Sequence, residues 1–174
     1  MTVAVSVTRA RSGAAGEATA AAVEAAYRSR HEDYLRVATA IAGSRELGRE
    51  AVQEGLARAL ARRRSFRGDG SVEAWLWRIV VNAARNARRD EPLVAEPHAA
   101  TAIDAALDPD ALLLRRRIAQ LPERQRLVLF LRYYADLDYA TIARVIGVRK
   151  GTVSATLNQA HAAVRRLLEE VPSR

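Results

Sequence analysis

The feature that most constrains the fold is Gly147, which separates two segments of helical periodicity within residues 136–168. Before this glycine, Ile142 and Ile146 recur one helical turn apart, and Asp138 stands where an N-cap residue accepts from free backbone N–H groups. A glycine can adopt the left-handed conformation that ends a helix. The sequence therefore predicts a helix, a tight turn and a longer helix, which together form a helix-turn-helix.

The second helix of this motif has one apolar and one polar side. Val153, Leu157 and Val164 form its apolar stripe. In a helix-turn-helix, the second helix enters the major groove of DNA, so the polar side predicts DNA as a ligand. The candidate contacts on this helix and its first turn are Arg149, Lys150, Thr152, Ser154, Thr156, Asn158, Gln159 and Arg165.

The distribution of charge also favours a polyanionic partner. The net charge of +8 divides into +5 over residues 24–90, −5 over residues 91–110 and +7 over residues 111–174, and the first 23 residues add +1. Two basic blocks joined by an acidic, proline-containing segment suit a polyanion that is contacted at two places. The chain has no cysteine, which excludes disulfides and cysteine-based zinc sites.

The remaining segments predict further helices and no strands. Apolar residues at helical spacing predict helices over residues 24–42, 45–63 and 72–89. Residues 1–23, rich in Ala, Ser, Thr and Gly, are expected to form a disordered tail. The expected fold is all-α, with two small helical domains over residues 24–90 and 111–174 and a flexible acidic linker over residues 91–110.

The helix predicted over residues 72–89 carries a second candidate DNA surface. Arg78, Asn82, Asn86 and Arg89 follow one another at spacings of four, four and three residues, so they share one face. Arginine neutralises phosphate, asparagine can pair with a base edge, and Trp75, one turn earlier, offers a flat surface for an unstacked base. The same pattern also fits a solvated helix face with a partly buried tryptophan.

Three motifs in order along the chain resemble those of one protein family. The stretch GREAVQEGLARAL resembles a D-x-V-Q-E signature, with Glu50 in place of the aspartate. AWLWRIVVNAARNARR resembles W-L-x-R-I-x-x-N-x-x-x-N, and residues 121–133 resemble L-P-x-x-x-R-x-V-x-x-L-R-Y, followed by the helix-turn-helix. Over residues 24–170 the chain resembles an extracytoplasmic-function sigma factor of the sigma-70 family, a subunit that starts transcription in bacteria.

This resemblance implies a role for each domain. The N-terminal, region 2-like domain is expected to bind the β′ clamp helices of core RNA polymerase, and to melt the −10 promoter element by capturing a flipped base. The implied polymerase-binding residues are Arg49, Glu50, Val52, Gln53 and Glu54. The implied −10 contacts are Arg67, Trp75, Arg78, Asn82, Arg85, Asn86 and Arg89, and the loop over residues 67–71 forms the edge of the base pocket.

The C-terminal, region 4-like domain is expected to read the −35 element and to contact the β flap of the polymerase. Members of the family often carry basic residues at the positions of Ser154, Thr156, Gln159 and His161. The neutral face here implies either an unusual −35 sequence or weak −35 binding that another contact compensates. The family also implies an anti-sigma factor as a partner, a monomer when uncomplexed and no cofactor. Because charge interrupts every apolar segment and residues 1–23 lack the apolar core of a signal peptide, we expect a cytoplasmic protein without membrane insertion.

Two other functions are compatible with parts of the chain. A helix-turn-helix regulator that does not initiate transcription explains residues 111–174 and leaves residues 24–90 without a task. A helical metal hydrolase could use His31, Glu32 and Asp33, but the H-E-x-x-H spacing of metal ligands is absent. The sequence thus predicts a non-enzymatic transcription protein without a metal or catalytic site.

Overall fold

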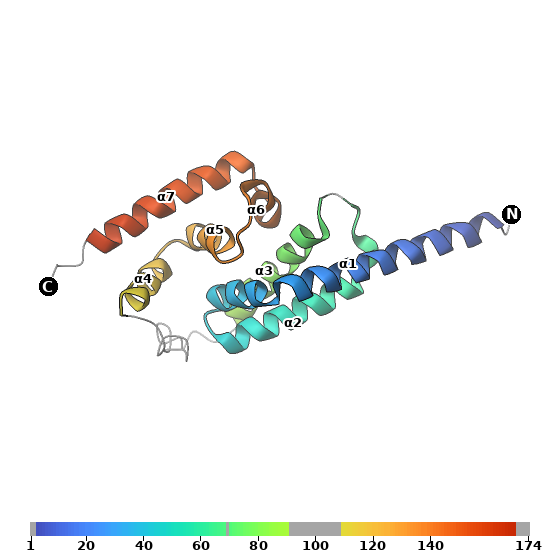
Figure 1. Ribbon diagram of the computed structural model, residues 1–174, viewed down its shortest axis with the longest axis horizontal. Coiled ribbons are helices and arrows are strands. Elements are labelled where there is room, and N and C mark those ends of the chain that lie inside the picture. Colours follow the sequence, from blue (N-terminus) through green and yellow to red (C-terminus); the bar gives the residue numbers. More distant parts are fainter. Residues whose placement is uncertain (1–2, 69, 91–108, 170–174) are drawn as a thin grey trace.

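The computed structural model describes residues 3–68, 70–90 and 109–169, and every regular element in these ranges is helical. The all-α prediction is confirmed, and Figure 1 shows the helices in two groups that lie against each other. The N-terminal bundle consists of α1 (Val3–Ala42), α2 (Arg45–Ala61) and α3 (Val72–Asp90), with a short 3-10 helix at Arg63–Ser65. The C-terminal unit consists of α4 (Pro109–Ala119), α5 (Glu123–Tyr133), α6 (Tyr139–Ile146) and α7 (Lys150–Glu169).

Helix α1 corrects the prediction of a disordered tail. It begins at Val3, and its first half projects from the N-terminal bundle as an arm (Figure 1). Val23 is fully buried, and a side chain at Gly16 would meet the aliphatic part of Arg64 at 3.1 Å. The polar, alanine-rich composition suggested disorder, but alanine has the highest helix propensity of all residues. The C-terminal part of the segment also contacts the 3-10 helix, where Gly16 lies near Arg64.

The bounds of the next two helices agree with the sequence to within about two residues, the usual uncertainty of helix ends. Ser44 caps α2 by accepting from the backbone N–H of Leu47 at 3.2 Å. The face of α2 that lies deepest is lined by small residues, among them Gly48 and Gly55. A β-carbon at Gly48 would lie 2.6 Å from the backbone of Thr39. These glycines therefore let α2 approach α1 and α3 closely.

Aromatic side chains fill the centre of the N-terminal bundle. Trp77 is fully buried, and its ring lies 4.0 Å from that of Tyr34, centroid to centroid. Burial raises the pKa of the Tyr34 hydroxyl well above its usual value. Neither the Tyr34 hydroxyl nor the Trp77 indole nitrogen has a hydrogen-bond partner in the structure. This core fixes one side of α3 against α1. It therefore determines which residues of α3 face outward.

The C-terminal unit is built around α5 and contains the predicted helix-turn-helix in α6 and α7. Five consecutive residues of α5, Leu127 to Leu131, are buried, as expected of a helix covered on all sides. Asp138 caps α6 by accepting from the backbone N–H of Thr141 at 2.8 Å, and Gly147 ends α6 in the left-handed conformation with φ of 71°. Both sequence signals are confirmed. Helix α4 begins at Pro109, inside the segment expected to be linker; residues 91–108 lie outside the described residues.

Candidate nucleic-acid interface

Helix α3 presents one polar row to solvent and buries the opposite side. Leu76, Val80 and Ala83 lie in the core, and a β-carbon at Gly55 of α2 would meet a methyl group of Val80 at 2.8 Å. Helical geometry turns the polar row away from this contact. The exposed residues of the row and its flank are Arg78, Asn82, Arg85, Asn86 and Arg89. The structure thus brings the predicted −10 residues of α3 together on one accessible surface.

The loop before α3 places a second aromatic ring beside Trp75. Trp75 is half-buried, and its ring centroid lies 5.5 Å from that of Phe66, which was not predicted as a site residue. Ser71 accepts from the backbone N–H of Ala74 at 3.1 Å and so fixes the start of α3. Arg67 is exposed next to Phe66. An apolar ring pair beside a guanidinium suits an unstacked base next to its phosphate.

On α7, the structure separates the candidate −35 residues into two groups. Arg149, Lys150, Asn158, Gln159 and Arg165 are exposed, and Thr152 and Ser154 are partly buried. The prediction that Thr156 faces outward is wrong. Its side chain is 7% exposed, and its hydroxyl donates to the carbonyl of Thr152 at 2.7 Å. Thr156 lies at the edge of the stripe formed by Val153 and Leu157. Its hydroxyl can be buried there because it bonds to a backbone carbonyl of its own helix.

The predicted polymerase-binding residues of α2 also divide by burial. Arg49, Glu50, Gln53 and Glu54 are exposed on one side of α2, and Glu54 accepts from Arg58 at 2.5 Å. Val52 is only 2% exposed and belongs to the core. Its expected contact with a partner protein is therefore corrected. The D-x-V-Q-E signature contains both a structural valine and a polar surface.

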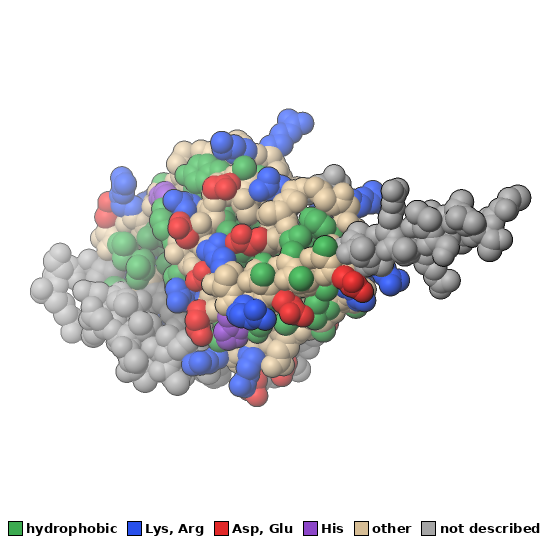
Figure 2. Space-filling model, turned by 45° about the vertical axis from the view of Figure 1, so that its right-hand side comes forward, with side chains coloured by type: hydrophobic (Ala, Val, Ile, Leu, Met, Phe, Trp, Pro, Cys, Tyr) green, Lys and Arg blue, Asp and Glu red, His purple; other side chains and the backbone are tan. Residues whose placement is uncertain are grey.

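Charge on the molecule is mixed rather than uniformly basic. Figure 2 shows a face on which acidic and basic side chains are interspersed. The described residues contain no group of three or more His, Asp or Glu side chains that could hold a metal ion, and His31, Glu32 and Asp33 form no such group. Within the same residues, no helix is both long and apolar enough to cross a membrane.

Comparisons with known proteins agree with this arrangement of two units. The family profile "Sigma-70 region 2" matches residues 26–92, and "Sigma-70, region 4" matches residues 111–164. The ECF RNA polymerase sigma factor SigM of Mycobacterium tuberculosis is 31% identical over 146 residues, covering 82% of this chain and 74% of that protein. The chain belongs to the ECF sigma factors of RNA polymerase.

Further relatives of this sigma factor come from distant bacteria. The RNA polymerase sigma-H factor of Pseudomonas aeruginosa is 32% identical, covering 69% of this chain and 72% of that protein. The ECF RNA polymerase sigma-E factor of Escherichia coli is 31% identical, covering 66% and 70%. The fold also matches the sigma factor RpoE of Bartonella quintana, solved in complex with the anti-sigma factor NepR, with a TM-score of 0.61, 19% identity and coverage of 82% and 96%.

Proposed function

We propose that this sigma factor melts the −10 element with α3 and reads the −35 element with α7, while the exposed side of α2 binds core polymerase. One observation carries the first assignment. The row Arg78, Asn82 and Asn86 is exposed along α3, next to the Phe66–Trp75 ring pair at its start. Guanidinium, amide and aromatic groups in one surface match the phosphates, edges and faces of an unpaired strand.

The proposed role of α7 rests on its helix-turn-helix geometry. Asp138 caps the start of α6, Gly147 ends α6 in the left-handed conformation before α7, and Asn158 and Gln159 remain exposed on the outer side of α7. Amide side chains can bond bidentately to adenine in the major groove. Arg149 and Lys150 at the start of α7, and Arg165 near its end, supply the phosphate contacts.

We further propose two protein partners. Core polymerase is bound by Arg49, Glu50, Gln53 and Glu54 of α2, a polar surface that suits a reversible contact. The C-terminal unit supplies a second contact, at the β flap. An anti-sigma factor is the other partner, in line with the B. quintana relative solved with NepR. Since polymerase acts on chromosomal DNA, the cytoplasm is the proposed site of action, and the free protein is proposed to be monomeric and to need no cofactor.

Run-off transcription tests the function directly. Purified core polymerase on a genomic promoter library should give promoter-specific transcripts only when this sigma factor is added. Asn82→Ala and Gln53→Ala should abolish them, whereas Arg28→Ala, at an exposed arginine of α1 outside the proposed surfaces, should not. Absence of transcripts together with retained DNA binding would instead identify a helix-turn-helix regulator.

A further inference from the structure

The segment that joins α2 to α3 is supported by α1 as well as by the helices on either side of it. The 3-10 helix at Arg63–Ser65 packs against α1. Gly16 of α1 is buried, and a β-carbon there would lie 3.1 Å from Cγ and 3.6 Å from Nε of Arg64. The N-terminal half of α1 therefore lies directly against the aliphatic stem of Arg64.

Burial along α1 shows that this contact belongs to a continuous packed side. Gly16, Ala20 and Val23 follow at spacings of four and three residues, and each is buried or partly buried. Such residues share one face of a helix. Ala18 and Ala21 point away from this face and are exposed. Residues 16–23 thus form the packed base of the arm that α1 makes in Figure 1.

The glycine at position 16 suits a close approach between α1 and the 3-10 helix. Within a helix, glycine is less favourable than alanine, because it loses more backbone freedom on folding. Most neighbours of Gly16 in this stretch are alanines. A larger side chain at this one position would press on Cγ of Arg64, which is only two bonds from the α-carbon of that residue. The absence of a side chain here lets the two elements pack together.

The 3-10 helix leads directly into the proposed base pocket. Its last residue, Ser65, donates to the carbonyl of Arg62 from both its backbone N–H and its hydroxyl, each at 2.8 Å, so the turn is well fixed internally. The next residue is Phe66, whose ring lies 5.5 Å from that of Trp75. Because Phe66 follows Arg64 by two residues, a displacement of Arg64 moves the ring as well.

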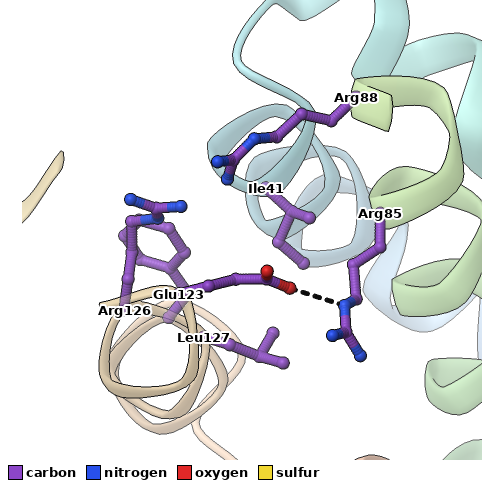
Figure 3. A pocket seen from close by; sticks show the side chains of 7 residues that line it. Ile41, Arg85, Arg88, Glu123, Arg126 and Leu127 are labelled. Atoms are coloured by element: carbon purple, nitrogen blue, oxygen red, sulfur yellow. Dashed lines mark hydrogen bonds and ion pairs between the residues drawn. The ribbon is translucent and has the colours of Figure 1, made fainter. Parts of the chain in front are cut away.

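Helix α3, which carries the other ring of the pocket, is held by contacts outside residues 16–23. Trp77 is fully buried against Tyr34. Further along α3, Nε of Arg85 donates to Glu123 at 2.6 Å, as the dashed line in Figure 3 marks, and Ile41 lines the same small pocket. The position of Trp75 is therefore set by the core, whereas that of Phe66 depends on the 3-10 helix and on what supports it.

We propose that residues 16–23 of α1 position the base pocket for the −10 element. By packing on the 3-10 helix, they hold Phe66 beside Trp75 and so set how tightly an unpaired base is bound. Gly16 is a positioning residue, since it acts through Arg64 and Phe66. The inference deepens the proposed function and rests on it for the ligand, a base flipped out of the −10 element. The sigma-70 region 2 match begins at residue 26, so this support lies outside the matched domain.

Hydrogen–deuterium exchange on the full-length free protein tests the structural half of this proposal. Gly16→Leu places a side chain against the Arg64 stem and should raise amide exchange in peptides covering residues 62–71. Ala18→Leu adds the same side chain at an exposed position of α1 and is the matched control. It should leave exchange in these peptides unchanged. Circular dichroism of each variant separates a local change from unfolding.

A binding experiment with the holoenzyme tests the functional half. The probe is a single-stranded oligonucleotide that carries the −10 element of a promoter recovered by run-off transcription. An abasic nucleotide is placed at each position in turn, and the position with the largest loss of affinity marks the captured base. We expect a loss of about tenfold for the unaltered protein, the usual worth of a stacked base. Gly16→Leu should bring the ratio of intact to abasic affinity close to one, while affinity for core polymerase stays unchanged.

A rescue separates positioning from a general loss of stability. Arg64→Ala removes the stem that the introduced leucine would press on. In the double variant, Gly16→Leu should therefore have little effect on the affinity ratio relative to Arg64→Ala alone. Such non-additivity is expected only if residues 16 and 64 act through their mutual contact.

The outcomes distinguish this inference from the proposed function. If no abasic position weakens binding by the unaltered protein, the proposed capture of a base fails, and the inference falls with it. If one position does weaken binding and Gly16→Leu leaves the ratio unchanged, only the inference is overturned. Unchanged exchange over residues 62–71 in Gly16→Leu would overturn it as well. A reduced ratio that Arg64→Ala restores would support both.

Discussion

The N-terminal bundle and the C-terminal unit each expose one helix that we propose contacts DNA, and they bury the other side of that helix with different side chains. Around α3 the fixing element is packing, with Trp77 and Tyr34 in ring contact and Gly48 and Gly55 allowing close helix approach. Around α7 it is packing as well, since Val153 and Leu157 are buried and α7 contacts α5 and α6, and Gly147 adds the left-handed turn before the helix. The two helices thus differ in the side chains that bury them, with a large aromatic ring on α3 and aliphatic side chains on α7.

The same comparison extends to the outer faces. The α3 row contains the guanidinium groups of Arg78 and Arg89, while the middle of α7 offers the amides of Asn158 and Gln159. Charge supplies affinity that depends on salt, and amides supply base selectivity. Both surfaces carry groups of each kind, since Asn82 and Asn86 lie beside the arginines of α3, and Arg149, Lys150 and Arg165 flank the amides of α7. The four predictions that follow test how the two units differ in packing and in outer face, from the largest expected effect to the smallest.

Removal of the Trp77 ring should lower the stability of the N-terminal bundle more than any other change considered. Trp77→Ala is expected to lower the free energy of unfolding by about 3–5 kcal/mol, because it empties a fully buried site. Urea denaturation followed by circular dichroism measures the change. Trp75→Ala, at a half-buried ring, is the control and should cost clearly less. Equal losses would show that Trp77 does not fix α3.

Replacing a glycine by alanine should have opposite effects on stability in the two units. Gly48→Ala should destabilise the bundle by about 1–3 kcal/mol, since its β-carbon would lie 2.6 Å from the backbone of Thr39. Gly151 on α7 has nothing within 4 Å of that position, so Gly151→Ala should stabilise by up to about 1 kcal/mol. Thermal unfolding of both variants checks the signs. A stabilising Gly48→Ala would mean that α1 and α2 are not in close contact.

Substitutions in the two outer faces should separate affinity from selectivity. Arg78→Ala should reduce the slope of log affinity against log salt by about one, whatever the DNA sequence. Gln159→Ala should leave that slope unchanged and weaken discrimination at one base pair by about 1–3 kcal/mol. Holoenzyme binding to promoter variants over a salt series measures both. An unchanged slope for Arg78→Ala would remove this residue from the phosphate contacts.

The cap of α6 should produce the smallest and most pH-dependent effect. Asp138→Ala should cost about 1 kcal/mol at neutral pH, the usual loss for an N-cap. The hydrogen bond from the Thr141 backbone lowers the pKa of Asp138, so the cap stabilises fully above the unfolded pKa of about 3.9. This advantage is lost as the pH falls through the lower, folded pKa. Unfolding curves of both proteins should therefore converge in acid.

Local signals explain how much of the fold could be predicted. The Asp138 cap, the left-handed Gly147 and the ends of α2 and α3 each depend on a few adjacent residues, and the structure agrees with all of them. Helical spacing also placed Asn82 and Asn86 on one exposed face. Their contacts with DNA remain predictions, because burial shows only that they are accessible.

What the sequence missed depends on partners far along the chain or on small shifts around a helix. Thr156 lies at the border of the polar face, where spacing cannot decide between solvent and core. Val52 was expected on the polymerase-binding surface, and only its neighbours in the fold show that it belongs to the core. The bond between Arg30 and Ala135 joins residues 105 positions apart, so no periodicity announces it.

The course of α1 has a practical consequence for biochemical work on this protein. The family match begins at residue 26, in the middle of a helix that starts at Val3. A shortened protein that begins at the match would lose Val23 from the core and the contact of Gly16 with Arg64. Apolar surface of the bundle would then face water, and such a fragment should aggregate more readily than the full chain.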